Sequence, residues 1–461
     1  MFNSENYLFM KKYSAIIAIL LAITAIGCTQ NGSESFDDLN IIPFRSNGKP
    51  LEKPFYHPNL LKNEDSAVNT LKSLRFVGSR PIYYMDYQIA ADWDKLILSP
   101  EDSETYSLYG TVKAVRILDD LLFNSPPHDI DREFKDSMKK TKGASSGFVC
   151  HNPQNELLFC RNYDGNTNPL VVVYNIAVKK DIEYKSVMMT ELPMAQMFAG
   201  LDSIYGNDSC LVNYNGTFDA LLRQPSAIMD GMNEKGLCIA AYQLPNFRRG
   251  FTTDRKEDKT LRPMGVCQNT GKPQITTTFL HWMILSKCAT VQDVVDLFHS
   301  HDYITTMPDI NIHWCVADST GAWATLEFWK DKNGKDSLYV MNEKYRQWAS
   351  YSSVNKIPYE YRCIENYYCN EEAARTYNYD YWQHGYSTKQ RALNMMSHYS
   401  PVMTEGDALR CLQYGNYGIE TPDEVTDWSC VYNPMNRTIL FNMRDDLSTV
   451  YLIDLKKEFD K

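Results

Sequence analysis

The chain has 461 residues, of which 44% are apolar, so it is long enough to bury a large core and is not globally disordered. It carries 47 basic and 57 acidic residues, a formal net charge of −10, and no long run of lysine or arginine. Because nucleic-acid binding depends on clustered positive charge, we exclude that class of function.

Residues 1–28 are predicted to be a bacterial lipoprotein signal peptide. Lys11 and Lys12 precede a short apolar run that ends at a small residue before Cys28. The run is too short to span a bilayer and is typical of a cleaved signal. Ala25–Cys28 resembles a lipobox, in which the cysteine becomes the lipidated first residue. We therefore expect a lipid anchor in the cell envelope, on the periplasmic or outer-membrane surface; an ordinary signal peptide or an anchor helix is the alternative.

Cysteine usage gives a second expectation about the exported chain. Of 12 cysteines, Cys28 would carry lipid, and the odd number that remains leaves at least one free thiol. No pair has CxxC spacing and none combines with histidine at zinc-finger spacing, so we predict no structural zinc site. Cys363 and Cys369 are spaced to allow a local disulfide.

The part of the chain before Cys150 is predicted to form three segments. Residues 29–54 are polar and irregular, typical of a tether. Residues 55–149 form an N-terminal pro-segment or α-chain, with a helix expected over Thr111–Phe123. Lys140–Gly147 is small and polar and is predicted to be an exposed, flexible joint.

Residues 150–461 are predicted to form the catalytic domain, in which hairpins alternate with pairs of helices. The expected hairpins cover residues 145–165, 225–245, 311–330 and 428–444, and the expected helices cover 276–288, 290–300, 387–399 and 404–415. Hairpins indicate antiparallel sheets, and the helix pairs cover their outer faces. We predict an α+β fold, a four-layer αββα sandwich.

The first hairpin contains the candidate nucleophile. Cys150 lies on a short apolar run, the chain turns through Asn152–Asn155, and the returning run carries Arg161 and Asp164. We expect thiol, guanidinium and carboxylate to meet, because a guanidinium favours the thiolate and lowers its pKa. The alternative is a buried structural cysteine beside a weak ion pair.

A thiol nucleophile also needs a base. No histidine lies in an obvious triad context, and His151 would point to the opposite face of the strand from Cys150. Cleavage between Val149 and Cys150 would free an α-amine with a pKa of about 7.7–8.0, which suits a general base. We therefore predict autoproteolysis at this bond.

Several motifs resemble those of a known family. "FCRNYD", "MNEKGLCIAAYQLP", "HWCVADSTGAWATLEF", "SVNKIP", "STKQRAL" and "DWSCVYNP" follow one another over about Gly147–Leu455. They are similar to motifs of the choloylglycine hydrolase and penicillin V acylase family, which also includes acid ceramidase, N-acylethanolamine acid amidase and isopenicillin N acyltransferase. The resemblance implies an N-terminal nucleophile (Ntn) hydrolase fold and hydrolysis of linear amide C–N bonds.

The resemblance also assigns roles to residues. It implies that Cys150 is the nucleophile, that Arg161 lies beside the thiol, and that Asp164 holds the free α-amine. Asn355 corresponds to the asparagine that donates to the oxyanion, and Arg391 to a second arginine that supports the charges around the cysteine.

Three departures from the family pattern bear on specificity. Gln243 stands where many members carry Asn or Tyr near the oxyanion, His151 follows Cys150 where Ser or Thr is usual, and Cys160 replaces Gly or Ala. The long segment before Cys150 has no counterpart in the bile-salt enzymes and resembles the α-chain of acid ceramidase.

We therefore expect a self-processing N-terminal cysteine amidohydrolase that acts on a small-molecule N-acyl amide of bile-salt, N-acyl-amine or penicillin V type. No metal and no cofactor is expected. The alternatives are an acyltransferase of the isopenicillin N type, in which an amine replaces water, and a non-catalytic ligand-binding surface lipoprotein. Homo-oligomerisation stays open.

Overall fold

The structure is a computed structural model that describes part of the chain. The described residues are 39–51, 56–78, 82–98, 110–124, 144–165, 169–191, 211, 218–244, 266–305, 311–330, 335–341, 363–366, 369, 394–395, 397–415, 425–444 and 446–459. The predicted signal peptide and Cys28 lie outside these residues, as do Asn355 and Arg391. Among the described helices, none has the length and apolar character needed to cross a membrane.

The first large sheet has seven strands in the order β1-β19-β18-β17-β6-β5-β16. Their bounds are β1 Ile41–Pro43, β5 Ala144–His151, β6 Leu157–Gly165, β16 Cys363–Glu365, β17 Val425–Asn433, β18 Thr438–Met443 and β19 Val450–Asp454. Neighbouring strands are antiparallel except β1 and β19, which are parallel.

The second large sheet has ten strands in the order β15-β14-β13-β10-β9-β8-β7-β4-β3-β2. Their bounds are β2 Gly48–Pro50, β3 Arg75–Val77, β4 Ile82–Tyr87, β7 Leu170–Asn175, β8 Ser186–Glu191, β9 Ile228–Asn233, β10 Cys238–Leu244, β13 Asn311–Ala317, β14 Trp323–Lys330 and β15 Asp336–Met341. Only β4 and β7 pair in parallel among these neighbours. A small parallel pair joins β11 Gln274–Thr276 to β12 Asp302–Ile304.

The described helices lie on the outer faces of the two large sheets or at their ends. The α-helices are α2 Glu64–Lys72, α3 Trp93–Leu96, α4 Gly110–Leu122, α7 Thr277–Lys287, α8 Val291–Ser300, α12 Glu405–Gln413 and α13 Leu455–Phe459, and the 3-10 helices are η2 Phe44–Asn47, η3 Pro58–Leu60 and η6 Asp219–Ser226. Helix α8, expected over residues 290–300, has Thr290 as its N-cap, because the Thr290 hydroxyl and the Asp293 carboxylate form a capping box.

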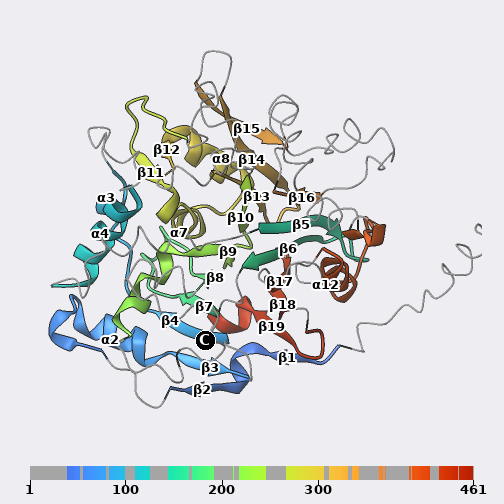
Figure 1. The fold of residues 1–461 in the computed structure, drawn as a ribbon, viewed down its shortest axis with the longest axis horizontal. Coiled ribbons are helices and arrows are strands. Elements are labelled where there is room, and N and C mark those ends of the chain that lie inside the picture. Colours follow the sequence, from blue (N-terminus) through green and yellow to red (C-terminus); the bar gives the residue numbers. More distant parts are fainter. Residues whose placement is uncertain are drawn as a thin grey trace, which may run out of the picture. The chain divides into compact units, whose positions relative to one another are not determined.

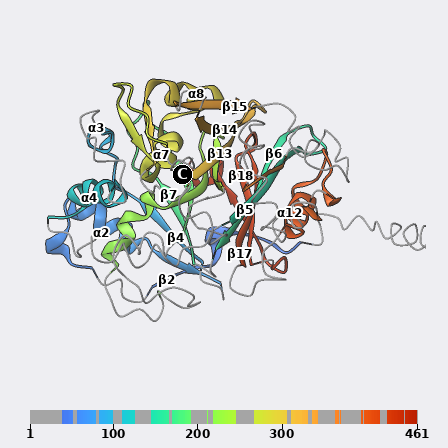
Figure 2. The same ribbon diagram turned by 45° about the horizontal axis from the view of Figure 1, so that its top comes forward.

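Three apolar clusters define four layers. One cluster packs α2, α4, α7 and α8 against the outer face of the ten-stranded sheet, the second fills the space between the two sheets, and the third packs α12 against the outer face of the seven-stranded sheet (Figure 1). Figure 2 shows α12 on one side of the sheets and α2, α4 and α7 on the opposite side. The predicted αββα sandwich is therefore confirmed.

The N-terminal part of the chain contributes strands to both sheets. Strands β1 and β2 fall within the predicted tether of residues 29–54, so the ordered fold begins earlier than the sequence indicated. Residues 144–147 of the predicted joint belong to β5, and 145–147 are buried rather than exposed. Strand β5 also runs through the predicted boundary at residues 149–150.

Helix α4, predicted over Thr111–Phe123, is held to η6 by a buried ion pair. The Nε and Nη2 atoms of Arg223 donate to the two carboxylate oxygens of Asp119 at 2.5 and 2.9 Å. Both side chains are almost completely buried, at 0% and 1% exposure. The pair therefore joins the segment before β5 to the part of the chain that follows it.

We predict that Asp119→Ala destabilises the fold strongly. The substitution leaves the Arg223 guanidinium buried without its carboxylate, which typically costs about 3–5 kcal/mol. The exposed neighbour Asp120 provides a control, because Asp120→Ala should change the free energy of unfolding by less than about 0.5 kcal/mol. Urea denaturation of both variants measures the difference, and equal losses would contradict a specific role for the ion pair.

Candidate active site

The predicted hairpin between Ser145 and Gly165 forms. Strands β5 and β6 are antiparallel, and the turn at Asn152–Asn155 joins them. Asn155 adopts a left-handed conformation with φ of 64°, which asparagine tolerates well. The Asn152 carboxamide oxygen accepts from the Gln154 and Glu156 backbone N–H groups and closes the turn.

The register of the hairpin places Cys150 and Arg161 on opposite faces. Cys150 lies opposite Leu158, whereas Arg161 lies opposite Gly147. Because side chains alternate along a strand, Leu158 and Arg161 point to different faces, and Cys150 shares the face of Leu158. The predicted meeting of thiol and guanidinium is therefore wrong.

Cys150 packs under helix α12 instead. Its side chain is 1% exposed and belongs to the outer cluster that includes Cys160, Leu409 and Cys411. Burial is the main cause that raises the pKa of the Cys160 thiol, and its hydrogen bond with Cys150 raises it further. The surroundings of Cys150 are those of a structural cysteine.

Arg161 points into the space between the sheets, where it meets a buried carboxylate. Its Nε atom lies 3.0 Å from Asp230 Oδ2, and the two side chains are 1% and 0% exposed. Nη1 donates to the Met229 carbonyl at 3.0 Å. Arg161 also lies over the rings of Tyr163 and Tyr242, at 5.3 and 5.2 Å from their centroids.

Asp230 is held from both sheets. It lies on β9, while the Trp428 indole and the Tyr432 hydroxyl, both on β17, donate to its two oxygens. Burial raises the pKa of Asp230, and Arg161 and the two donors oppose that rise. The carboxylate thus fixes the position of Arg161 and partly balances its charge.

Ser145 is the residue that the guanidinium reaches. Arg161 Nη2 donates to Ser145 Oγ at 3.2 Å, and Ser145 is 3% exposed. Ser145 lies opposite Tyr163 in the β5–β6 register, on the face that Arg161 shares. The register therefore brings a hydroxyl, and not the predicted thiol, to the arginine.

Asn366 completes the contacts of Ser145. It follows β16 directly, and its Oδ1 accepts the Ser145 backbone N–H at 2.8 Å. Its Nδ2 donates to the Gln243 carbonyl at 2.6 Å. Gln243, predicted to lie near the oxyanion, is therefore near the site. Its side chain is half-buried, and its backbone carbonyl accepts the bond from Asn366.

Asp164 lies close to Ser145 in the register but on the other face. It is opposite Ala144 and is 1% exposed. The Thr426 hydroxyl donates to its Oδ1 at 2.5 Å. Leu158, the register partner of Cys150, is six positions from Asp164 along β6. This spacing corresponds to roughly 20 Å along the strand. Asp164 is thus near the start of β5 and distant from the predicted nucleophile.

A glycine allows the two sheets to approach beside the site. A Cβ at Gly147 would lie 2.4 Å from the Cys160 carbonyl oxygen and 2.6 Å from the Tyr242 hydroxyl. No larger residue fits without movement of backbone or of a fully buried tyrosine. Gly147 therefore keeps Tyr242 against the strand that carries Ser145.

Sequence reasoning missed three residues of this group, Ser145, Asp230 and Asn366. Strand alternation counted back from Arg161 would have found Ser145, once the turn had fixed the register. Asp230 and Asn366 lie on other strands or loops, and no local spacing links them to Arg161. The predicted Asn355 and Arg391 lie outside the described residues, so their roles stay predictions.

A sequence comparison identifies the class of enzyme. Residues 146–352 match the model of the linear amide C-N hydrolases, choloylglycine hydrolase family. The resemblance predicted from the motifs is thereby confirmed for this part of the chain, and the match supports a hydrolase of linear amide C–N bonds. A search among curated proteins gave no match.

Solved structures of similar proteins were also found. Penicillin V acylase from Agrobacterium tumefaciens is 17% identical, with 68% of this chain and 86% of that chain covered and a TM-score of 0.41. A mutant of conjugated bile acid hydrolase from Clostridium perfringens is 14% identical, with 68% and 93% covered and a TM-score of 0.38.

We predict that His281 makes stability depend on pH. Burial lowers the pKa of this α7 histidine to about 4, and nearby Arg161 contributes in the same direction. At this position the unfolded chain takes up a proton as the pH falls below about 6.5, whereas the folded chain does so only near pH 4. The free energy of unfolding should therefore fall by about 2 kcal/mol between pH 7 and pH 5.

Urea denaturation at pH 7 and pH 5 measures this loss. His281→Asn should make it smaller, because asparagine can still donate to the Ile228 carbonyl that the imidazole contacts but cannot take up a proton. His299 on α8 is exposed and serves as the control, since His299→Gln should leave the difference between the two pH values unchanged. An unchanged difference in His281→Asn would contradict the assignment.

Proposed function

We propose that the protein is a self-processing Ntn hydrolase of linear, non-peptide amides, with Ser145 rather than Cys150 as its nucleophile. One observation carries this proposal: the contact of 3.2 Å between Arg161 Nη2 and Ser145 Oγ, in a buried space between the sheets. Among the residues that the structure describes, Cys150 has no comparable neighbour, because the register turns it toward α12.

The charge of Arg161 suits it to assist a serine nucleophile. A guanidinium that donates to Oγ stabilises the negative charge that develops when the hydroxyl loses its proton. Asp230 keeps the guanidinium in place through Nε, so that Nη2 stays directed at Ser145. The start of the family match at residue 146, next to Ser145, also supports this assignment, because the bile-salt enzymes begin almost at their nucleophile.

Self-processing would occur at the bond between Ala144 and Ser145. Oγ attacks the Ala144 carbonyl carbon, the peptide C–N bond breaks, and the Oγ proton passes to the departing nitrogen. Water then hydrolyses the ester and leaves a carboxylate on Ala144 and a free α-amine on Ser145. That amine has an ordinary pKa of about 7.7–8.0 and serves as the general base.

Turnover of a substrate repeats the chemistry with an external amide. Oγ attacks the substrate carbonyl, the α-amine carries the proton to the leaving amine, and water resolves the acyl ester. Asn366 contacts the Ser145 nitrogen and is suited to hold the amine after cleavage. Asp164, opposite Ala144, brings a carboxylate near the new terminus.

Substitutions of the two candidate nucleophiles test the proposal. Ser145→Ala should stay a single chain and lose turnover by at least about a hundredfold, whereas Cys150→Ala should be cleaved and active. Ser145→Cys keeps a nucleophile and should still be processed. Ser146→Ala is the matched control, because Ser146 Oγ accepts from Asn162 on the face of the hairpin opposite to Arg161. Intact mass and amide hydrolysis measure both effects.

The result also separates the two nucleophiles. Cleavage before residue 150 together with an inactive Cys150→Ala would restore the original prediction and refute Ser145.

After cleavage the N-terminal chain should stay bound, because β4 pairs with β7 and Asp119 pairs with Arg223. Size-exclusion chromatography should therefore show both chains in one peak.

The substrate class requires a panel of N-acyl amides. The family match supports a linear amide but does not rank acyl groups or amines. Conjugated bile acids, N-acylethanolamines, ceramides and phenoxyacetyl amides cover the predicted types. Added amines test the acyltransferase alternative, because acyl transfer to an amine would compete with hydrolysis.

A second part of the proposal concerns location. We infer that Cys28 carries lipid, because the lipobox-like Ala25–Cys28 follows the short apolar run. Cys28→Ser should move the protein from the membrane fraction to the soluble fraction, as shown by immunoblot. Retention of the variant in the membrane would favour an anchor helix.

A further inference from the structure

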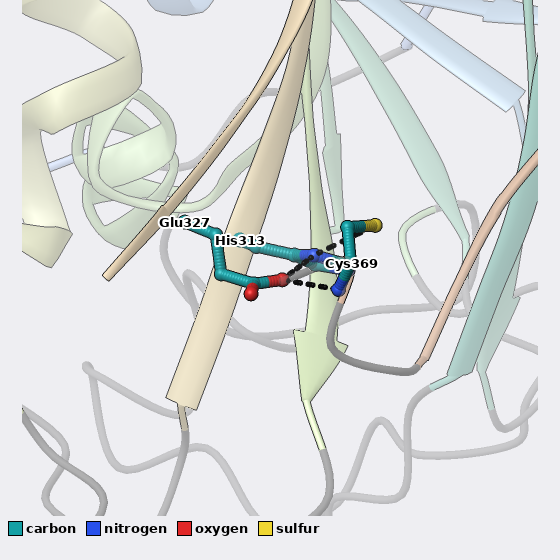
Figure 3. A group of neighbouring side chains, drawn as sticks. All are labelled: His313, Glu327 and Cys369. Carbon is teal, nitrogen blue, oxygen red and sulfur yellow. Dashed lines mark hydrogen bonds and ion pairs between the residues drawn. The ribbon is translucent and has the colours of Figure 1, made fainter. Parts of the chain in front are cut away.

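A second group of reactive side chains lies beside Tyr242, whose ring contacts both His313 and Arg161, but takes no part in the proposed chemistry. It consists of His313 on β13, Glu327 on β14 and Cys369, which follows β16 (Figure 3). His313 Nδ1, Glu327 Oε2 and Cys369 Sγ lie within 4.8 Å of one another. Both strand residues are completely buried, and Cys369 is partly buried and not disulfide-bonded.

The three side chains come together through tertiary structure. His313 and Glu327 lie on adjacent antiparallel strands, and Nδ1 is 3.1 Å from Oε2. Cys369 reaches them from a loop, where its backbone N–H donates to Oε2 at 2.7 Å and its Sγ lies 4.0 Å from Nδ1. The predicted disulfide with Cys363 is not formed, since Cys369 is not disulfide-bonded.

The arrangement does not suit a nucleophile with a base. Both the thiol and the carboxylate approach the same ring nitrogen, Nδ1 of His313, so the imidazole cannot relay a proton between its two nitrogens. Burial raises the pKa of the Cys369 thiol, and the charge of Glu327 raises it further.

The ligand types and spacing match a zinc ion. Because the three ligand atoms lie within 4.8 Å of one another, an ion placed between them would be no more than about 2.8 Å from each. Zinc binds sulfur at about 2.3 Å and nitrogen or oxygen at about 2.0–2.2 Å. Shifts of a few tenths of an ångström would close the site. Calcium and magnesium prefer oxygen ligands, so a thiolate with an imidazole favours zinc.

The charges also balance. A zinc ion would replace the thiol proton of Cys369 and bind the Nδ1 lone pair of His313 in the tautomer that carries its proton on Nε2, which leaves a thiolate, a carboxylate and a neutral imidazole. These ligands carry two negative charges against the two positive charges of the ion. A buried site of zero net charge avoids the cost of an uncompensated ion.

We propose that His313, Glu327 and Cys369 form a zinc-binding site with a fourth position for water or another ligand. The site ties β13 and β14 to the loop that carries Asn366, three residues before Cys369, and so supports the contact between Asn366 and Ser145. It does not depend on which residue is the nucleophile. No spacing motif marks it, since the three ligands are far apart in the sequence.

Metal binding by the full chain tests the site. Protein purified, stripped with chelator and dialysed against zinc should retain one zinc per chain by elemental analysis, and cobalt substitution should give a thiolate-to-cobalt absorption band. Cys369→Ser should abolish the band and weaken zinc binding by more than tenfold, since even outer-shell partners contribute about 10–100-fold. Cys267→Ser, at an exposed cysteine, is the control and should keep both.

Glu327→Gln distinguishes a zinc ligand from a hydrogen-bond acceptor. The amide oxygen can still accept from the Cys369 N–H but carries no charge, so zinc binding should weaken while the melting temperature without metal stays near that of wild type. Zinc should raise the melting temperature of wild type and Cys267→Ser, and not of Cys369→Ser. Absence of zinc binding in wild type, or an unchanged cobalt band in Cys369→Ser, would overturn the proposal.

Discussion

A buried ion pair between the two sheets determines the geometry of the candidate active site. Arg161 on the seven-stranded sheet and Asp230 on the ten-stranded sheet meet at 3.0 Å, with Trp428 and Tyr432 donating to the same carboxylate. A buried pair of this kind adds little stability over an apolar contact, because desolvation offsets the attraction. The pair instead determines the position of Arg161, because it directs the remaining guanidinium donors toward Ser145 and the Met229 carbonyl. The packing of the two sheets therefore also determines the geometry of the site.

The alternation of side chains along β5 and β6 decides which residue that guanidinium meets. The sequence predicted the hairpin correctly, because its turn chemistry is local and Asn152 and Asn155 are typical turn residues. It did not predict the faces, because they depend on which residues are opposite each other, and a shift of one residue reverses them. The same local logic explains why the sequence predicts the start of α8, whose cap lies within the chain around Thr290, but not the Arg161–Asp230 pair between distant strands.

The N-terminal segment shows the same limit at the level of domains. Strands β1, β2 and β3 have three residues each, too few for a period of two to appear in the sequence. Strand β4 pairs in parallel with β7 across a long connection, which no local pattern indicates. A segment that looked like a tether and a removable pro-segment therefore supplies edges and core to both sheets, and its removal would expose the apolar faces that β4 and α4 cover.

A short segment around β16 connects the two halves of the site. Strand β16 pairs with β5, so that Ile364 lies opposite Gly147 and the next residues approach Ser145. Asn366 then bridges the Ser145 N–H to the Gln243 carbonyl on the other sheet, and Cys369 reaches Glu327 on β14. The segment thus contacts both sheets within seven residues. It connects them at this point, as the Arg161–Asp230 ion pair connects them within the core. Because the Ser145 hydroxyl is held by the ion pair and its nitrogen by Asn366, a displacement of one sheet relative to the other would alter both contacts at once. Ser145 is therefore positioned by the packing of the two sheets and not by its own strand alone.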